Sequence, residues 1–405
     1  MAEYYNNQRH HKPRTKRKAK YRPRSMRGND IFVRIVVVLV LFIAAVFGLL
    51  LLLPHISGGR IDIFARAEPT PEPTAEPEQT DHPMENADMD EVVHSIGITD
   101  TAFQWYADSF AYGDTLMFCA GEVVNGDAYM TALLQVSTDK NASTTAQRIN
   151  IVLENDHIMS PVFNDSWLCY FDAKSTGGGK IFCTKYDSDY SAKSLVKEVY
   201  TGHPSLFLSG DYLCWTERTG TAMDKLYLCD LRTMETATVQ MFNKTTYYGV
   251  SLPHILKGKL VWADVDTENA SGGITSQISV LNVESGEFLS YKPGTYVHDP
   301  KTNGGDVLCW LTGNHGTDSD LYVSYDMGES ELIEENVVDF YMDEDFVAYQ
   351  KDDNIYVYIL STKNKYMLNR KGQSVQLNGA SDGCVMWSDV TSHERELPEF
   401  AVIPR

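Results

Sequence analysis

The chain has 405 residues, with 55 acidic and 35 basic side chains, a formal net charge of −20 and 43% hydrophobic residues. Residues 1–66 hold 13 basic and 3 acidic side chains, so residues 67–405 carry a formal charge of −30. Such an acidic region is poorly suited to binding nucleic acid or anionic lipid headgroups.

The N-terminal region predicts a single-pass membrane anchor. Residues 1–30 contain ten Lys or Arg and two acidic residues, and residues 35–53 follow without a charge. At 1.5 Å per residue these 19 residues span ~28 Å of helix, close to the thickness of a bilayer's hydrocarbon core. We therefore expect a basic cytoplasmic tail over 1–30 and a transmembrane signal-anchor helix over 31–54. The rest of the chain is then expected outside the cell, anchored to the cell membrane. A cleaved signal peptide, cut near residues 65–67, is the alternative.

Residues 55–92 are predicted to form a disordered linker. Pro, Glu and Thr alternate between residues 68 and 78, and large apolar side chains are absent there. Such a segment buries too little surface to fold, and extended polyproline geometry makes it a stalk.

Residues 93–405 are predicted to form one all-β domain, a seven-bladed β-propeller. A short apolar run ending in an aromatic anchor recurs at intervals of 52, 45, 47, 48, 39 and 38 residues. The anchors are Phe118, Tyr170, Trp215, Trp262, Trp310, Tyr349 and Trp387. A second run with Tyr between apolar residues follows several of them, as at 225–229, 320–325 and 354–358. Repeats of ~40–50 residues with several short strands each are typical of a propeller.

The last repeat indicates how the ring closes. Only one further strand, at residues 400–403, is visible after Trp387, and the segment 92–98 before the first repeat has no other partner. We expect this segment to pair beside the C-terminal strands, because that pairing would cover an open sheet edge. Six blades plus a capping hairpin is the alternative.

Residues 203–215, His-Pro-Ser-Leu-Phe-Leu-Ser-Gly-Asp-Tyr-Leu-Cys-Trp, resemble the repeats of TolB-like β-propeller proteins. Those repeats carry a Pro, a turn with Gly or Asp, and an apolar-x-aromatic strand. The Ser-Pro-Asp-Gly turn of that family is absent from most repeats here. The resemblance implies a membrane-anchored bacterial surface propeller. In TolB-like proteins the fold is usually a binding module, or a gate on a hydrolase domain, and no hydrolase sequence is visible here.

Polar residues at matching places in the repeats predict a site on one rim. Three histidines precede an anchor by 12 or 13 residues, and four acids follow an anchor by two. They are His157, His203, His298, Asp172, Glu217, Asp264 and Asp389. Because a blade's first strand starts where its second strand ends, we expect His157 opposite Asp172 and His203 beside Glu217. Imidazoles backed by carboxylates could bind a divalent metal, or a cationic or sugar ligand. Alternatively, these pairs only satisfy hydrogen bonds where strands leave the core.

Seven cysteines raise the question of disulfides in an exported domain. Cys169 with Cys183, and Cys214 with Cys229, are placed symmetrically about predicted loops, so each pair could face across adjacent strands. The alternative is that they are small buried hydrophobic residues.

The leading functional hypothesis is a non-catalytic binding or scaffold module that takes a protein or cell-wall ligand, a glycan included, and needs no cofactor. Nucleophile elbows, phosphate-binding loops, zinc-type Cys pairs and a His-Glu-x-x-His motif are absent from the sequence. A lyase or hydrolase using the His and carboxylate rim is the alternative. A structural subunit of an envelope complex is the third possibility.

Overall fold

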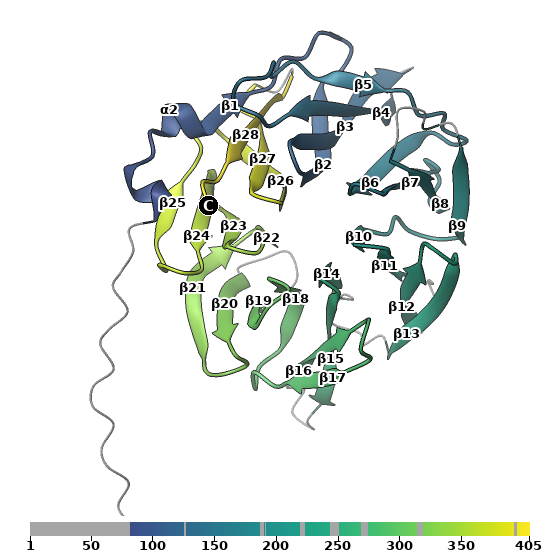
Figure 1. Ribbon diagram of the computed structural model, residues 1–405, viewed down its shortest axis with the longest axis vertical. Helices are drawn as coiled ribbons and strands as arrows, with labels where there is room; N and C mark the ends of the chain where they lie inside the picture. The colour runs from purple at the N-terminus through teal and green to yellow at the C-terminus, as the bar shows by residue number, and fades with distance from the viewer. Residues whose placement is uncertain are drawn as a thin grey trace, which may run out of the picture. The chain divides into compact units, whose positions relative to one another are not determined.

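Each of the seven aromatic anchors lies in the second strand of its own four-stranded antiparallel sheet, and the sheets form a ring around a central channel (Figure 1). The computed structural model describes residues 82–124, 127–186, 190, 192–218, 223–243, 251–268, 274–313, 319–392 and 395–405. The predicted tail and anchor helix, residues 1–54, lie outside these residues. No helix among the described residues is long and apolar enough to cross a membrane.

The strands repeat in one order from the channel outwards, and the blades are numbered here in chain order of their second strands. The first strands, which line the channel, are β2 (Trp105–Tyr112), β6 (His157–Phe163), β10 (Leu206–Ser209), β14 (His254–Leu256), β18 (Val297–Thr302), β22 (Asp339–Met342) and β26 (Val375–Ser381). The second strands are β3 (Thr115–Val124), β7 (Trp167–Ala173), β11 (Tyr212–Glu217), β15 (Lys259–Glu268), β19 (Val307–Thr312), β23 (Phe346–Lys351) and β27 (Cys384–Asp389).

The outer half of each blade follows the same plan. The third strands are β4 (Asp127–Ser137), β8 (Gly179–Lys185), β12 (Met223–Asp230), β16 (Ile274–Asn282), β20 (Ser319–Tyr325), β24 (Asn354–Ile359) and β28 (Leu397–Val402). The outermost strands are β5 (Gln147–Ile149), β9 (Lys193–Val199), β13 (Glu235–Asn243), β17 (Phe288–Tyr291), β21 (Ser330–Val337), β25 (Lys365–Met367) and β1 (Val93–Ser95).

Ring closure follows the prediction from the sequence. Val93 pairs with Ala401 and Ser95 pairs with Glu399, so β1 is the outermost strand of blade seven. The N-terminal strand and the three C-terminal strands therefore share one sheet, and the seventh blade is complete. The prediction of seven blades is confirmed, and the alternative of six blades with a cap is excluded.

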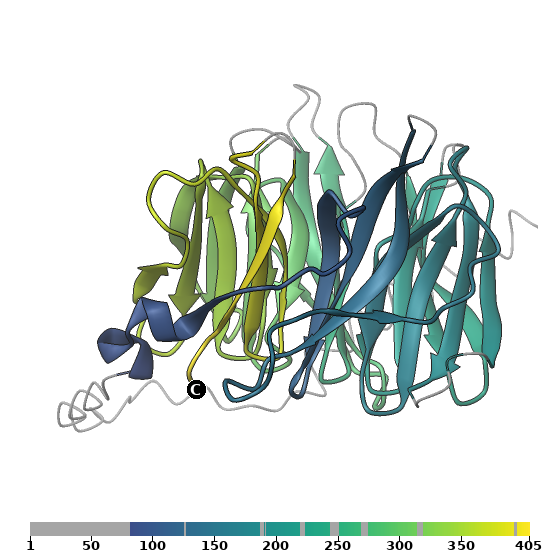
Figure 2. The same ribbon diagram turned by 90° about the horizontal axis from the view of Figure 1, so that it is seen from above.

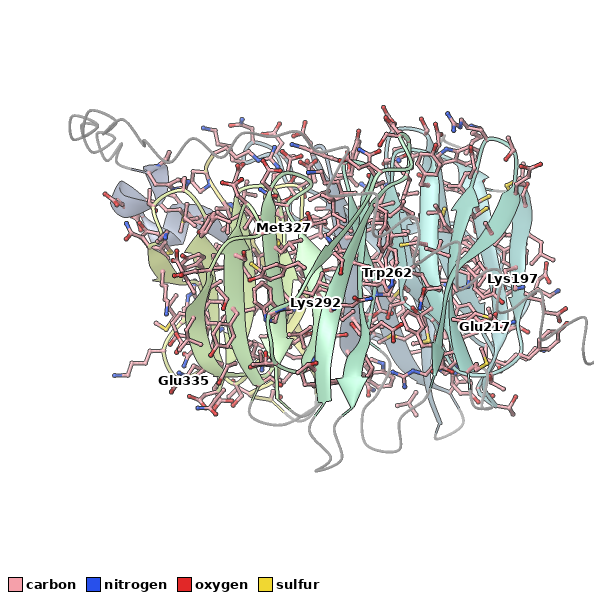
Figure 3. All side chains as sticks on the ribbon, turned by 90° about the horizontal axis from the view of Figure 1, so that it is seen from below. Lys197, Glu217, Trp262, Lys292, Met327 and Glu335 are labelled. Carbon is pink, nitrogen blue, oxygen red and sulfur yellow. The ribbon has the colours of Figure 1, made fainter. Side chains whose placement is uncertain are left out.

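The aromatic anchors form the core between blades, as predicted. All seven are at most 3% exposed. Figure 3 shows Trp262 at mid-height of the ring, and its side chain belongs to the apolar cluster between blades three and four. Because both faces of each second strand are covered, these strands are apolar along most of their length.

The predicted linker ends earlier than residue 92. A 3₁₀ turn, η1 (Pro83–Asn86), and a single helical turn, α2 (Met89–Val92), precede β1. Met84 is 1% exposed and Val92 is 6% exposed, and both belong to the apolar cluster between blades six and seven. These two apolar side chains provide the burial that the Pro-rich residues before them lack, so this part of the chain is ordered.

The register decides which cysteines can meet. Cys169 directly faces Cys183 across β7 and β8, as predicted. Cys214 instead faces Leu228, and Cys229 faces Leu213, so the predicted Cys214–Cys229 pair is wrong. One step of register puts two residues on opposite faces of a sheet. All seven cysteines are buried free thiols in the structure, in agreement with the alternative of small hydrophobic residues.

The ring has two faces. The turn face carries the turns between first and second strands, and the hairpin face carries the connections between second and third strands. Ile403 donates its backbone N–H to the Gly383 carbonyl in the β26–β27 turn, so the C-terminus lies at the turn face (Figure 2).

Candidate functional site

The seven predicted rim residues are dispersed around the hairpin face, most of them held by local hydrogen bonds. His157 pairs with Ala173, one residue away from the predicted Asp172. Its Nδ1 accepts the Met130 N–H at 3.1 Å, and its ring stacks on Tyr129. Asp172 is fully buried and accepts the N–H groups of Glu154 and Asn155, at 2.6 and 3.0 Å. It therefore fixes the loop that leads into β6.

The other predicted rim residues of blades four, five and seven have similar structural partners. His298 is 1% exposed, with its Nδ1 3.0 Å from the Asp299 carboxylate. Asp264 accepts the Gln240 side-chain amide at 2.7 Å, and Asp389 accepts the Gln373 amide at 3.0 Å. Among the described residues, no three His, Cys, Asp or Glu side chains are placed to hold a metal ion.

Blade three is the exception, because His203 and Glu217 line the same small pocket. This pocket has a volume of about 260 Å³ and also includes Thr216 and Arg218. His203 is exposed and its ring lies 5.9 Å from that of Phe171, whereas Glu217 is only 8% exposed. Figure 3 shows Glu217 close to one face of the ring.

A larger cavity lies inside the ring, towards the opposite face. Its volume is about 580 Å³, and all seven first strands or their flanking residues contribute to its wall. The contributing side chains include Asp108, Ser160, Leu206, His254, Lys301, Asp339 and Asn378. It extends from mid-height of the channel to the turn face, where Tyr112, Asp165 and Asp382 line its mouth.

Bulges in the first strands turn polar side chains towards the channel. The register shifts between Ala107 and Phe110, between Met159 and Val162, and between His298 and Lys301. Asp108, Ser160 and Asp299 sit at these bulges in the left-handed region, with φ near +50°. A bulge leaves one residue unpaired in the ladder and re-aims its side chain, so each of these becomes free to bond elsewhere.

The bulged residues join neighbouring blades in a polar belt around the channel. Asp108 accepts the Ser160 N–H at 2.8 Å, and the Ser160 hydroxyl accepts the Leu206 N–H at 2.7 Å. Asp299 accepts the Leu252 N–H at 2.6 Å. These bonds satisfy the backbone N–H of the bulged Ser160 and those of Leu206 and Leu252 in neighbouring blades.

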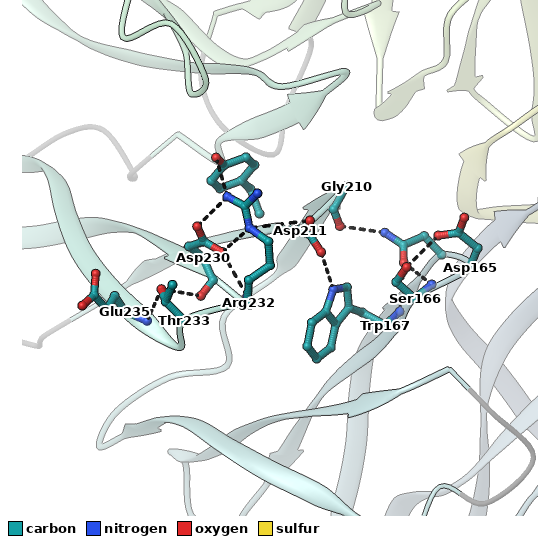
Figure 4. A network of polar contacts seen from close by, with 11 residues as sticks. Asp165, Ser166, Trp167, Gly210, Asp211, Asp230, Arg232, Thr233 and Glu235 are labelled. Atoms are coloured by element: carbon teal, nitrogen blue, oxygen red, sulfur yellow. Dashed lines mark hydrogen bonds and ion pairs between the residues drawn. The ribbon is translucent and has the colours of Figure 1, made fainter.

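The wall near the mouth is held by a second network (Figure 4). Asn164 donates to the Gly210 carbonyl at 2.7 Å, and the Trp167 indole donates to Asp211 at 2.7 Å. Asp211 also lies 3.7 Å from Arg232, which forms a closer pair with Asp230 at 2.7 Å. The first-to-second-strand turns of blades two and three are thus fixed to each other beside the mouth.

Lys301 is the most unusual group in the cavity wall. It is 5% exposed, and its Nζ lies 4.8 Å from the Phe340 ring centre and 5.3 Å from that of Tyr341. In the part of the chain that the structure describes, this Nζ has no hydrogen bond and no carboxylate within 4.0 Å. Burial lowers the pKa of Lys301, and the more distant Asp339 and Asp299 oppose that change.

Three other ionisable groups in the cavity wall also have shifted pKa values. The Asp339 side chain is exposed on its channel side, and protein atoms surround it elsewhere. This surrounding protein raises the pKa of Asp339 to about 6, although the nearby Lys301 acts to lower it. Burial, and then the nearby Lys301, lower the pKa of His254 to about 3, so its ring is neutral. Its Nδ1 accepts the Thr302 N–H at 3.3 Å, which leaves Nε2 to carry the proton. Burial also raises the pKa of Asp108.

The cavity combines apolar walls with an excess of acids. Phe110, Phe207 and Met342 provide apolar surface. Six carboxylates and two lysines line it, and one of those lysines, Lys257, is paired with Glu344 at 2.5 Å. The cavity can therefore accept a ligand that offers both apolar surface and polar atoms.

Sequence reasoning missed this cavity because its polar residues occur singly in apolar strands. A positional signal exists, since Asp108 and Asp339 each precede an anchor by ten residues and Lys301 precedes Trp310 by nine. A charge at that place in a first strand can reach the channel, because one edge of the first strand pairs with the second strand and its other edge borders the channel. A comparison of the seven repeats at this position identifies these charged residues from the sequence.

Comparisons with known proteins identify a fold and no family. No protein-family model and no curated protein matches the sequence. The structure is similar to the β-propeller domain of the Trilobed protease from Pyrococcus furiosus, with a TM-score of 0.53, 14% identity, and coverage of 75% of this chain and 94% of that one. That propeller has an open velcro topology, whereas β1 closes the ring here.

Two further solved structures match at lower scores. TolB from Acinetobacter baumannii gives a TM-score of 0.40 and 10% identity, covering 59% of this chain and 60% of that one. An oligogalacturonate lyase in complex with manganese gives 0.46 and 11%, covering 75% and 90%. Likeness at these identities concerns the fold alone.

Proposed function

We propose that this chain is a non-catalytic binding propeller, held outside the cell membrane by the anchor over 31–54, and that its protein or cell-wall ligand enters the central cavity from the turn face. The observation that carries this proposal is the buried Lys301 amine, which faces a cavity of about 580 Å³ without a protein partner. The amine nitrogen is not one of the fully buried polar atoms that lack a hydrogen bond, so it is open to the solvent of the channel, and a ligand that enters the cavity can replace that solvent as its hydrogen-bond partner.

The shape of the cavity also favours binding. Its volume lies within the range of ~300–1,000 Å³ that is usual for ligand pockets. The belt of Asp108, Ser160 and Asp299 fixes the surrounding strands to one another, so the cavity is preformed. A preformed cavity reduces the ordering cost of binding.

Photo-crosslinking in intact cells tests the location of the site. Tyr112 lines the mouth and is 40% exposed, whereas Tyr200 is 75% exposed and lies beside Gly178 on the hairpin face. Either tyrosine is replaced by benzoylphenylalanine and the cells are irradiated. We expect a specific adduct from position 112 that disappears when Ala380→Trp fills the cavity. Ala237→Trp on the exposed face of β13 is the matched control. Adducts from position 200 alone would place the site elsewhere.

Protease treatment tests the orientation. Protease added to intact cells should degrade residues 93–405 and leave a fragment containing the basic tail. Protection of the propeller from outside would contradict the proposed location. Release of a protein that begins near residue 68 would indicate a cleaved signal peptide.

A lyase or hydrolase at the hairpin face is a second candidate, favoured by the pocket that His203 and Glu217 both line. A reaction there requires a general acid or base within reach of a substrate. Loss of turnover in His203→Gln, with an unchanged melting temperature, would support it. The Glu217 carboxylate is a poorer probe, because it is 8% exposed and its removal also affects folding.

A further inference from the structure

The Lys301 ammonium has three N–H donors and no acceptor among the described residues, although it is 95% buried. The rings of Phe340 and Tyr341 lie beside it and provide cation–π attraction, which leaves its hydrogen bonds unmade. A ligand that displaces channel solvent from this amine must therefore offer it an acceptor atom.

The charges around Lys301 limit what that acceptor is. Asp339 and Asp299 both interact electrostatically with the ammonium, although neither carboxylate is within 4.0 Å of Nζ. His254, which also faces Lys301, is neutral. Because these two carboxylates already act on the ammonium, an additional anion bound there would also be repelled by them. An anionic ligand would also have to pass Asp165, Asp343 and Asp382 at the mouth.

Lys301 in β18 and Asp339 in β22 lie on neighbouring first strands and both line the cavity, so a ligand group that can both accept and donate suits this part of the wall. A hydroxyl oxygen accepts from an ammonium and donates to a carboxylate at the same time. A peptide carbonyl accepts from Lys301 but cannot donate to Asp339. An ammonium or guanidinium donates to Asp339 but is repelled by Lys301. Of these groups, a hydroxyl alone is compatible with both side chains, because it can accept from the ammonium and donate to the carboxylate.

The walls add a second requirement. The rings of Phe110, Phe207 and Tyr341 line the cavity, together with aliphatic side chains such as Met342. A sugar ring presents hydroxyls at its edge and a face of C–H groups, so it matches polar groups and aromatic walls together. The cavity volume of about 580 Å³ equals that of roughly 20 liquid waters, which is room for a sugar.

The geometry points to a sugar subsite at the inner end of the central cavity, in which Lys301 donates to a hydroxyl oxygen, Asp339 accepts from a hydroxyl, and Tyr341 contacts the face of the ring. This inference rests on the proposed binding function and names its ligand class as an uncharged glycan. Lys301 and Asp339 determine specificity, because each rejects a ligand charge of its own sign.

Saturation-transfer NMR on the full chain in a sugar-free detergent tests this assignment. The probes are N-acetylglucosamine and glucose as neutral sugars, glucuronate as an anionic sugar, glucosamine as a cationic sugar, and trilysine as a basic peptide. We expect signals from the neutral sugars, with at least tenfold weaker binding of the charged probes. Lys301→Met and Asp339→Asn should each weaken neutral-sugar binding at least tenfold. Lys140→Met, at an exposed position outside the cavity, is the matched control and should leave it unchanged.

The other outcomes are distinguishable. Neutral-sugar binding that survives Lys301→Met would show that the amine is only hydrated, and would overturn the subsite. Trilysine binding that is lost in Asp339→Asn, without any sugar signal, would assign the cavity to a basic peptide. No sugar signal together with a specific adduct at position 112 would overturn the sugar class and leave the binding function standing. Absence of both the sugar signal and the adduct at position 112 would overturn the sugar subsite and the binding function. Melting temperatures of the variants exclude misfolding as the cause.

Discussion

Trp215 and Tyr227 are direct partners across β11 and β12, with their rings stacked at 5.4 Å. The same relationship joins Trp310 to Tyr322. In blades three, five and six the anchor and the later Tyr of the sequence repeat are thus the two halves of one contact. In blade three the Nζ of Lys197, from blade two, lies 4.7 Å from the centre of the Tyr227 ring, so the contact also joins two blades.

We expect Tyr227→Leu to lower the free energy of unfolding by about 1–2 kcal/mol, because it removes both the stacking and the cation–π contact. Tyr322→Leu should cost less, since no described lysine lies over that ring. Urea unfolding measures both. A double-mutant cycle with Lys197→Met gives the coupling to Tyr227, and a coupling of zero would contradict the contact.

Ring closure by β1 predicts that the N-terminal strand stabilises the whole domain. Ile96 is 6% exposed in the cluster between blades seven and one, so Ile96→Ala should cost about 2–4 kcal/mol. Val338→Ala, at a position that is 62% exposed, is the control and should change little. A chain beginning at residue 103 should melt at a lower temperature and aggregate through the uncovered edge of β28. Equal melting of the two chains would refute the closure.

Blades five and six are joined by a clamp that should fail in acid. Glu334 in β21 pairs with Lys351 at 2.6 Å and with Lys365 at 2.9 Å, both in blade six. Although burial raises the pKa of Glu334, these two ammonium groups bring it down to about 2. A carboxyl whose pKa is lowered on folding stabilises the protein above its unfolded pKa of about 4.5 and loses that contribution as the pH falls towards 2.

We therefore expect Glu334→Gln to cost about 1–2 kcal/mol at pH 7 and much less near pH 2. Unfolding in urea at several pH values measures this. Glu331→Gln is the control, because Glu331 pairs with Lys363 at the surface, where both side chains are about half exposed. An equal loss at both pH values would exclude the electrostatic cause.

Asp339 should give the opposite pH dependence. Its pKa is raised to about 6 on folding, so its contribution to stability is greatest below its unfolded pKa and is lost as the pH rises through 6. Lys301→Met should raise the pKa of Asp339 further, because it removes the cation that opposes the rise. Carboxyl ¹³C chemical shifts between pH 4 and pH 8, assigned with Asp339→Asn, measure both values. A lower pKa in Lys301→Met would contradict the placement of the two groups.

The cysteines should be unreactive thiols in the folded protein. Burial raises the pKa of Cys214, Cys309 and Cys384, so little thiolate is present near neutral pH. We expect iodoacetamide to modify seven thiols after unfolding and almost none before. When an oxidant is added, we expect any disulfide to join Cys169 to Cys183, because these two residues face each other across β7 and β8. A peptide linking Cys214 to Cys229 would contradict the register of blade three.

The sequence by itself determined the repeat, the number of blades and the way the ring closes. These follow from the apolar pattern around the seven anchors and from the single unpaired segment before them, because each sheet must cover both faces and leave no open edge. The linker was predicted to extend too far towards the propeller, because Met84 and Val92 are buried only by residues of blades six and seven, which are distant in the sequence. The Cys214–Cys229 pair was misplaced by one step of register, which composition and symmetry do not fix.

The tertiary structure decided where a ligand has room to bind. The predicted histidines and carboxylates are spread around the hairpin face, most of them with structural partners, and His203 with Glu217 is the predicted pair that shares a pocket. Lys301, Asp339 and Asp108 lie on different blades and come together only because seven first strands converge on one axis. The bulges that aim such residues into the channel depend on hydrogen bonds between blades. A local sequence pattern does not specify such contacts between residues that are far apart in the chain.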